Sequence, residues 1–106
     1  MPKYLIEANY TPDGLKGVLA KGGTARREAV EKMCADVGAT LESFHFAFGD
    51  TDAFVIVDVP DNITAAAIGM IVGSSGMAGA KTTVLLTPEE VDRAAAVKAT
   101  YTPPGK

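Results

Sequence analysis

The sequence predicts an α+β domain built on a four-stranded antiparallel sheet. The first observation is a pair of apolar runs, at residues 44–48 and 53–59, separated by a short acidic turn, which indicates a β-hairpin. The second is that a strand-like and then a helical segment precede this hairpin, while a helical and then a strand-like segment follow it. The third is the length of 106 residues, which is enough for one domain with a modest core and too short for two.

The first strand is expected at residues 3–10, which are rich in strand-forming residue types. Residues 11–14, Thr-Pro-Asp-Gly, are typical of a turn that ends it. A helix in two pieces is expected next, because the Lys-Gly-Gly run at 21–23 interrupts the helical spacing and Thr24 can cap the second piece. Gly38 follows this piece where a left-handed residue commonly ends a helix. The apolar stripe of the second piece comprises Val30, Met33, Cys34 and Val37.

After the hairpin, which pairs residues 40–48 with 53–59, a second main helix is expected from about residue 62 to the Gly-Ser-Ser-Gly run at 73–76. Residues 80–86 predict the fourth strand. Thr87 and Glu90, with a proline between them, form a capping box that starts an extra C-terminal helix.

The resulting order, strand-helix-strand-strand-helix-strand, is that of a ferredoxin-like fold. Right-handed crossovers place both main helices on one face of the sheet. We therefore expect a single domain at residues 1–99, followed by a flexible C-terminal tail at residues 100–106.

A two-residue turn at Asp50-Thr51 would determine which side chains face these helices. It would pair Phe48 with Ala53, Phe46 with Val55 and Phe44 with Val57. Alternation along the strands then predicts a core face composed of Phe44, Phe46, Phe48, Val55, Val57 and Val59, joined by Tyr4, Ile6, Ala8, Tyr10, Thr82, Val84 and Leu86.

The opposite face of the sheet is expected to be of mixed character. Its large apolar side chains are too many to be left in water on a bare sheet, while its ionisable side chains are too polar for a dry core. Such a face suits sheet-on-sheet association of two copies, so we predict a homodimer. The apolar members are Leu5, Phe54, Ile56 and Leu85, and the ionisable ones are Glu7, His45 and Asp58.

Several segments resemble the GYD-domain family, small bacterial proteins in the dimeric α/β-barrel superfamily. The resemblance rests on residues 9–15 (Asn-Tyr-Thr-Pro-Asp-Gly-Leu), the hairpin turn and exit at 49–61, and residues 65–76 and 81–85. Thr51 stands where the signature turn Gly-x-Tyr-Asp has a tyrosine. The resemblance implies a ferredoxin-like dimeric α/β barrel. The family has no settled activity, so the resemblance implies no particular reaction.

His45 and Asp58 are the candidate catalytic residues. His45 is the only histidine, and its side chain titrates near neutrality. The expected register places it diagonal to Asp58, which could orient the imidazole as a general base. A structural alternative is an interface histidine paired with Asp58 or Glu7. Axial ligation of haem by His45 is a third hypothesis, and no other cofactor is expected.

Tyr4, Tyr10 and Arg26 are the candidate ligand-binding residues. Tyr4 and Tyr10 could line a gap between sheet and helices, although tyrosines there also fill cores. Arg26 lies in the first turn of a helix, where free N–H groups and a guanidinium could hold a carboxylate or phosphate. The structural alternative, which we favour, is a flexible linker at residues 21–24 followed by a solvated start of the helix. Cys34, on the buried stripe, is expected to be an inert thiol.

Composition limits the partners. A net charge of −3 argues against nucleic-acid binding, and no apolar stretch is long enough to suggest a membrane span. One histidine and one cysteine predict no metal site. A single cysteine and the lack of a signal peptide at the start favour the cytoplasm.

Two functions stay open at this level. The first is binding of a small apolar or aromatic metabolite in a cavity between sheet and helices, with cofactor-independent proton transfer or oxygenation as the chemistry that His45 would serve. The second is a non-catalytic regulatory or interaction module whose sheet face serves homo-oligomerisation only.

Overall fold

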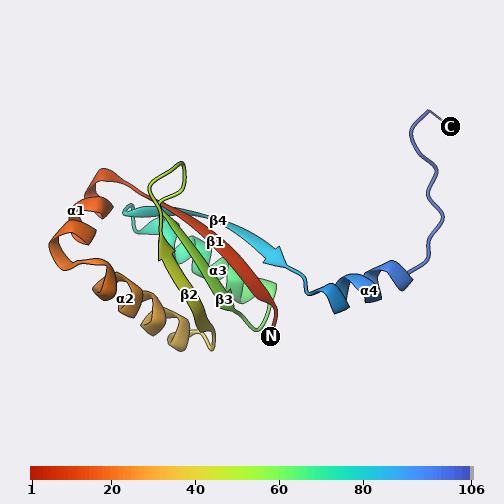
Figure 1. Cartoon of the computed structure of the whole chain (residues 1–106), viewed down its shortest axis with the longest axis horizontal. Helices are drawn as coiled ribbons and strands as arrows, with labels where there is room; N and C mark the ends of the chain where they lie inside the picture. The colour runs from red at the N-terminus through yellow and green to blue at the C-terminus, as the bar shows by residue number, and fades with distance from the viewer. Residues whose placement is uncertain (106) are drawn as a thin grey trace.

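A computed structural model describes residues 1–105 and confirms the ferredoxin-like α+β fold (Figure 1). The four strands form one antiparallel sheet in the order β2-β3-β1-β4. The elements are β1 (Lys3–Tyr10), α1 (Pro12–Lys21), α2 (Gly23–Asp36), β2 (Thr40–Phe46), β3 (Ala53–Asp58), α3 (Asn62–Ser74), β4 (Ala78–Leu85) and α4 (Pro88–Ala96).

The predicted break between α1 and α2 is present at Gly22, whose φ of 87° favours glycine. The starts of the two helices differ from the sequence prediction. The Thr-Pro-Asp-Gly segment begins α1, because Thr11 accepts a hydrogen bond from the Gly14 N–H. Thr24 lies inside α2 and does not cap it, since Gly22 occupies the N-cap position and no side chain caps that end.

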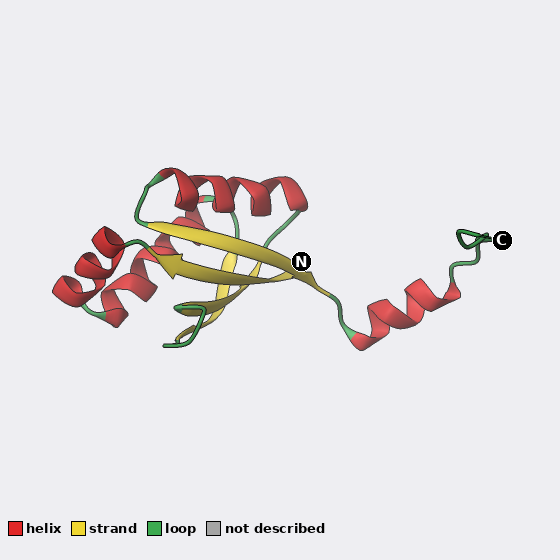
Figure 2. Ribbon diagram, turned by 90° about the horizontal axis from the view of Figure 1, so that it is seen from above, coloured by secondary structure: helices red, strands yellow, loops and turns green. Residues whose placement is uncertain are grey.

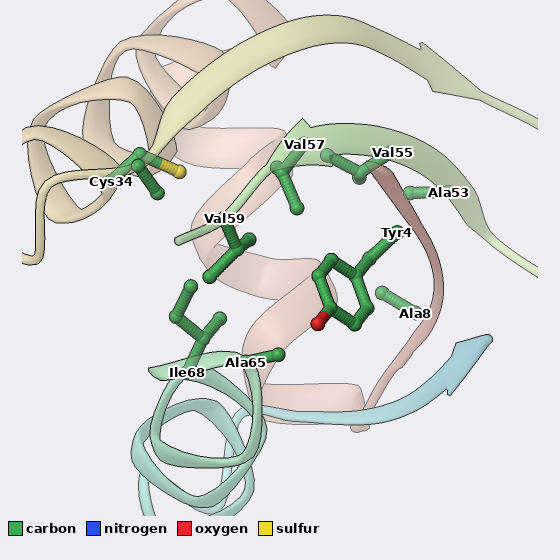
Figure 3. Close-up of a cluster of buried hydrophobic side chains, with 10 residues drawn as sticks. Tyr4, Ala8, Cys34, Ala53, Val55, Val57, Val59, Ala65 and Ile68 are labelled. Carbon is green, nitrogen blue, oxygen red and sulfur yellow. The ribbon is translucent and has the colours of Figure 1, made fainter. Parts of the chain in front are cut away.

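One face of the sheet packs against α2 and α3, as expected (Figure 2). Tyr4, Val55 and Val57 point from the strands toward Ile68 of α3, and Cys34 reaches the same layer from α2 (Figure 3). Alternation puts every second strand residue into this layer. The remaining buried members are mostly small, so the core is thin: Ala8, Ala39, Ala53, Val59, Ala65 and Ala78.

The predicted hairpin register is wrong by two residues. Phe46 lies opposite Ala53 and Phe44 opposite Val55, because the strands are joined by a longer loop at 47–52. The Ala47 N–H closes this loop by donating to the Asp52 carbonyl at 2.7 Å. A shift of two residues leaves each side chain on the same face of the sheet, so the prediction of which strand residues face the helices does not depend on this error.

A β-bulge at Glu42 also departs from simple alternation. Leu41 pairs with Val57 and Ser43 with Ile56, so Glu42 is the extra residue on β2. The bulge brings Leu41 to the core layer together with Phe44, three positions later.

The predicted core face is larger than the observed core. Phe48 is fully exposed because it lies in the hairpin loop, and Phe46 is 44 % exposed. At the β4 edge, Thr82, Val84 and Leu86 are also exposed, since the chain turns away after this strand instead of covering it.

The helix α4 begins with the predicted capping box between Thr87 and Glu90. It stands beyond the end of the sheet in both ribbon views, and none of its residues is buried (Figures 1 and 2). The radius of gyration of 17.0 Å therefore exceeds the value of about 13 Å expected for a compact chain of this length. Residues 97–105 form no helix or strand, and Lys106, the last residue of the predicted tail, lies outside the described residues.

Gly14 and Gly17 provide a test of the contact between α1 and the start of β4. A methyl group at Gly14 would overlap the backbone carbonyl of Met77, whereas one at Gly17 would meet nothing within 4 Å. Gly14→Ala should lower the free energy of unfolding by about 1–3 kcal/mol. Gly17→Ala should raise it by about 0.5–1 kcal/mol through helix propensity. Urea unfolding followed by circular dichroism measures both, and equal stabilities of the two variants would contradict the close approach.

Candidate functional site

A cavity of about 530 Å³ lies where α1, α2, the end of α3 and the start of β4 meet. A smaller cavity of about 40 Å³ adjoins it between the sheet and α2 and α3. The two share Tyr10, Arg26, Met33, Val72 and Ala78 as lining residues. The two therefore make up one candidate site, in which the larger cavity is named the outer cavity and the smaller one, next to the sheet, the inner cavity.

Small residues create the outer cavity. Gly14 and Gly17 line it from α1, and Ala25 and Ala29 line it from α2. Helices that face each other with such residues leave space where larger side chains would fill it. Sequence reasoning missed this wall, although its signal was present as small residues three or four positions apart on each helix.

Arg26 is the charged residue at the junction of the two cavities. It continues the apolar stripe of α2 four positions before Val30, and both residues line the inner cavity. Its Nε atom is buried and has no hydrogen-bond partner. Within residues 1–105, Arg26 also makes no ion pair. A buried donor without a partner is costly, so a movement of the Arg26 side chain that gives Nε an acceptor in the cavity would be favourable.

Tyr10 lies beside Arg26 at the end of β1. Burial raises the pKa of its hydroxyl, and this effect exceeds the opposing effect of Arg26. The phenol is therefore neutral at pH 7 and can donate or accept a hydrogen bond. The backbone is held by Asp52, whose Oδ2 accepts from the Tyr10 N–H at 2.9 Å. Phe46 packs near the Tyr10 ring, with the ring centroids 6.4 Å apart.

Tyr4, the other tyrosine of the predicted ligand site, is not brought to the cavity. It is 3 % exposed in the core and lines neither the outer nor the inner cavity. Its hydroxyl donates to the side chain of Asn62, the first residue of α3. This bond anchors the start of α3 to β1.

The two candidate catalytic residues are far from each other along the sheet. His45 is exposed and lies opposite Phe54, whereas Asp58 lies opposite Thr40. The predicted diagonal contact between them is wrong, because the longer hairpin loop shifts β2 by two residues. Glu7 lies on the other side of Phe54, so it does not adjoin His45 either. His45 is also on the opposite face of the sheet from Tyr10 and the cavities.

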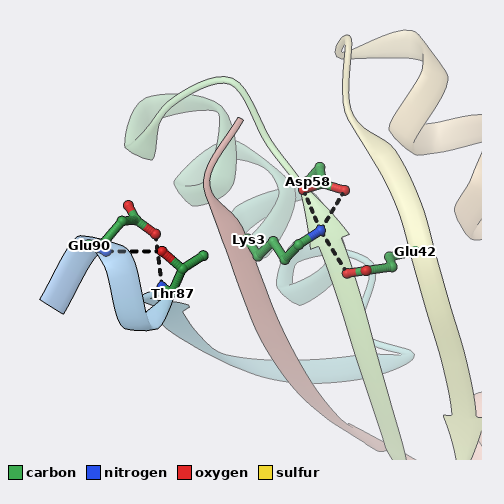
Figure 4. Close-up of polar contacts among 5 residues, drawn as sticks. All are labelled: Lys3, Glu42, Asp58, Thr87 and Glu90. Atoms are coloured by element: carbon green, nitrogen blue, oxygen red, sulfur yellow. Dashed lines mark hydrogen bonds and ion pairs between the residues drawn. The ribbon is translucent and has the colours of Figure 1, made fainter. Parts of the chain in front are cut away.

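Asp58 has a different partner on the face of the sheet that α2 and α3 do not cover (the open face). The Lys3 Nζ is 3.0 Å from the Asp58 carboxylate and 3.0 Å from that of Glu42 (Figure 4). The hydrogen bond to Asp58 has the largest effect on the pKa of Lys3 and raises it, and the hydrogen bond to Glu42 raises it further. The Glu42 bulge thus places a second carboxylate on this ammonium.

Other candidate features of the chain are structural. Cys34 is 1 % exposed, and burial raises the pKa of its thiol, which disfavours the reactive thiolate. Among residues 1–105, no group of three or more His, Cys, Asp or Glu side chains is placed to hold a metal ion. No helix in the same range has the length and apolar character needed to cross a membrane.

The raised pKa of Tyr10 predicts a loss of stability at alkaline pH. The unfolded chain releases the Tyr10 proton at a lower pH than the folded one, so unfolding becomes more favourable as the pH rises above about 10. In urea unfolding between pH 8 and 11, wild type should lose stability relative to Tyr10→Phe only in the upper part of this range. Tyr101→Phe, at an exposed position, is the control and should follow wild type throughout. Parallel curves for wild type and Tyr10→Phe would contradict the burial of this hydroxyl.

The chain was compared with known proteins. The model of the GYD domain matches residues 4–95, which include β2, β3, β4, all of β1 except Lys3, and the residues that line the cavity. Neither the curated proteins nor the solved structures gave a match. Because the match spans most of the sequence, the chain belongs to the GYD-domain family.

Proposed function

We propose that this GYD-domain protein binds a small apolar or aromatic molecule in the cavity between α1, α2 and the sheet. The observation that carries the proposal is the cavity of about 530 Å³, which has the size of a small-molecule site. Its walls are mainly apolar, and Tyr10 and Arg26 are among the few polar side chains that line it. A few polar groups in an apolar concavity are the usual means of orienting a ligand.

The binding function does not include His45. Phe44 and Phe46, its neighbours on β2, belong to the helix-covered side, so the imidazole points to the other side of the sheet. Proton transfer or oxygenation by His45 on a molecule in this cavity would have to act across the sheet. The proposal therefore rests on binding alone, with Tyr10 as the neutral hydrogen-bonding group.

Blocking the cavity tests this function. Ala25→Trp places an indole in the outer cavity, whereas Ala35→Trp places it at an exposed position on the same helix. Monocyclic aromatic and medium-chain aliphatic compounds that bind should raise the Tm of wild type and Ala35→Trp by mass action, and should leave Ala25→Trp unshifted. The melting temperature in a thermal-shift panel is the measurement. Equal shifts for all three proteins would contradict binding in this cavity.

A second candidate function, self-association, is favoured by the pattern of the open face. A central row across the four strands consists of Ser43, Ile56, Leu5 and Thr83. The rows on either side each carry one large apolar side chain, Phe54 or Leu85, beside charged groups, with Glu7 and Lys81 in the first row and Lys3 and Asp58 in the second. Apolar side chains interspersed with polar ones that can pair are typical of a protein interface. The same surface on two copies can pair around a two-fold axis, so we propose a second copy of this chain as its occupant.

Sedimentation equilibrium tests the dimer. Wild type should sediment with twice the mass of the chain, and Ile56→Glu should sediment as a monomer because it buries a charge at the centre of the face. Ile63→Glu adds the same charge on α3 at a position 83 % exposed, and it should stay dimeric. A monomeric wild type, or an Ile56→Glu dimer of unchanged affinity, would contradict this interface.

A further inference from the structure

The charge distribution around the cavity indicates what kind of molecule it accepts. We infer that the ligand is an amphipathic anion, with a carboxylate held by Arg26 and an apolar tail in the inner cavity. This inference rests on the proposed binding function and names the ligand class for the same site. It depends on three observations: the unpartnered Nε atom of Arg26, the excess of positive charge at the outer cavity, and the apolar lining of the inner one.

The unpartnered atom of Arg26 is informative because of its place in the guanidinium. A carboxylate that binds side-on accepts two parallel hydrogen bonds, one from Nε and one from a terminal nitrogen. The Nε atom is buried without a partner, and Arg26 lines both cavities. Tyr10, neutral at pH 7, adds a hydroxyl donor beside it. Together these donors match the acceptors of a carboxylate better than those of a neutral alcohol or amine.

The surrounding charges favour an anion as well. Lys21 lines the outer cavity, and within residues 1–105 it makes no ion pair. The first turn of α2 has no acidic residue, so the positive end of its dipole is uncompensated. Asp13 is the one carboxylate among the lining residues, and its Oδ1 is 3.9 Å from the Lys16 ammonium. Within residues 1–105, the cavity thus presents two cations that make no ion pair, Arg26 and Lys21, and one carboxylate that is paired with Lys16.

The inner cavity suits the tail. Ile6 and Phe44 line it from the sheet, and Val30 and Ile68 line it from α2 and α3. A carboxylate at Arg26 would therefore direct an attached alkyl or aryl group between the sheet and α3. Side-chain adjustment would enlarge the inner cavity of about 40 Å³ as the tail enters.

Isothermal titration with octanoate and 1-octanol tests the inference, because the two probes share a tail and differ in charge. Wild type should bind octanoate at least tenfold more tightly than 1-octanol. Arg26→Met should abolish this difference by weakening octanoate tenfold or more, with 1-octanol changed less than twofold. Arg27→Met is the matched control, since Arg27 is exposed and paired with Glu31, and it should retain the preference.

Folding of the variant is checked by its thermal melt. Arg26→Met should be at least as stable as wild type, because it removes a buried donor without a partner. Arg26→Lys, which keeps the charge and loses the planar fork, should give an intermediate octanoate affinity and serves as the second variant if Arg26→Met does not fold.

The outcomes separate the inference from the function on which it rests. Equal binding of octanoate and 1-octanol by wild type, or octanoate binding that survives Arg26→Met, would overturn the anionic ligand while leaving the cavity as a binding site. Binding of neither probe, together with an unshifted thermal panel, would overturn both.

Discussion

The structure depends on the hydrogen bonds of one residue, Asp52, at the end of the hairpin loop. Its carbonyl closes the loop by accepting from Ala47, its N–H donates to Ala8 at 3.0 Å, and its carboxylate accepts from Tyr10 at 2.9 Å. Bonds to a charged acceptor contribute about 1.5–3 kcal/mol, more than neutral ones. These contacts join the hairpin to β1 just beyond the last paired residues of β1 and β3, and they orient the strand end that carries Tyr10. Asp52 also occupies the aspartate position of the signature turn, which gives that residue a physical role in this chain.

The cavity and the thin core follow from the same choice of small residues. Alanines at positions such as 8, 53 and 65 let the helices approach the sheet closely, while glycines and alanines on α1 and α2 leave space between those helices. A larger residue at Gly17 or Ala29 would bury more apolar surface and stabilise the fold, but it would reduce the space around Arg26. Retaining both the space and a buried donor without a partner lowers stability, a pattern more often associated with binding sites than with cores.

Local rules in the sequence predicted the elements better than they predicted their relative positions. The capping box of α4, the left-handed Gly38 and the alternation of β3 depend on neighbours within a few residues, and the structure contains all three. The hairpin register depends instead on Asp52 bonding to β1, more than 40 residues away, which no local pattern reveals. The pairing of His45 with Asp58 was wrong for that reason. Arg26 and Tyr10 were predictable as polar residues near the helical layer, whereas the outer cavity beside them arises only when α1 folds back on α2.

The open face and α4 both leave apolar side chains exposed in a single copy of the chain. A nine-residue helix is only marginally stable alone in water. The helix α4 has an apolar side but no buried residue, so packing of that side against a partner would stabilise it. Covering the open face would also enclose Lys3, Asp58 and Glu42 (Figure 4). One ammonium with two carboxylates leaves an excess negative charge, which is expensive to bury. We therefore expect Lys3, Asp58 and Glu42 to lie at the rim of any such interface. Lys3 and Asp58 pair at one end of the sheet, in the row next to that of Leu5 and Ile56, which agrees with a place at the rim.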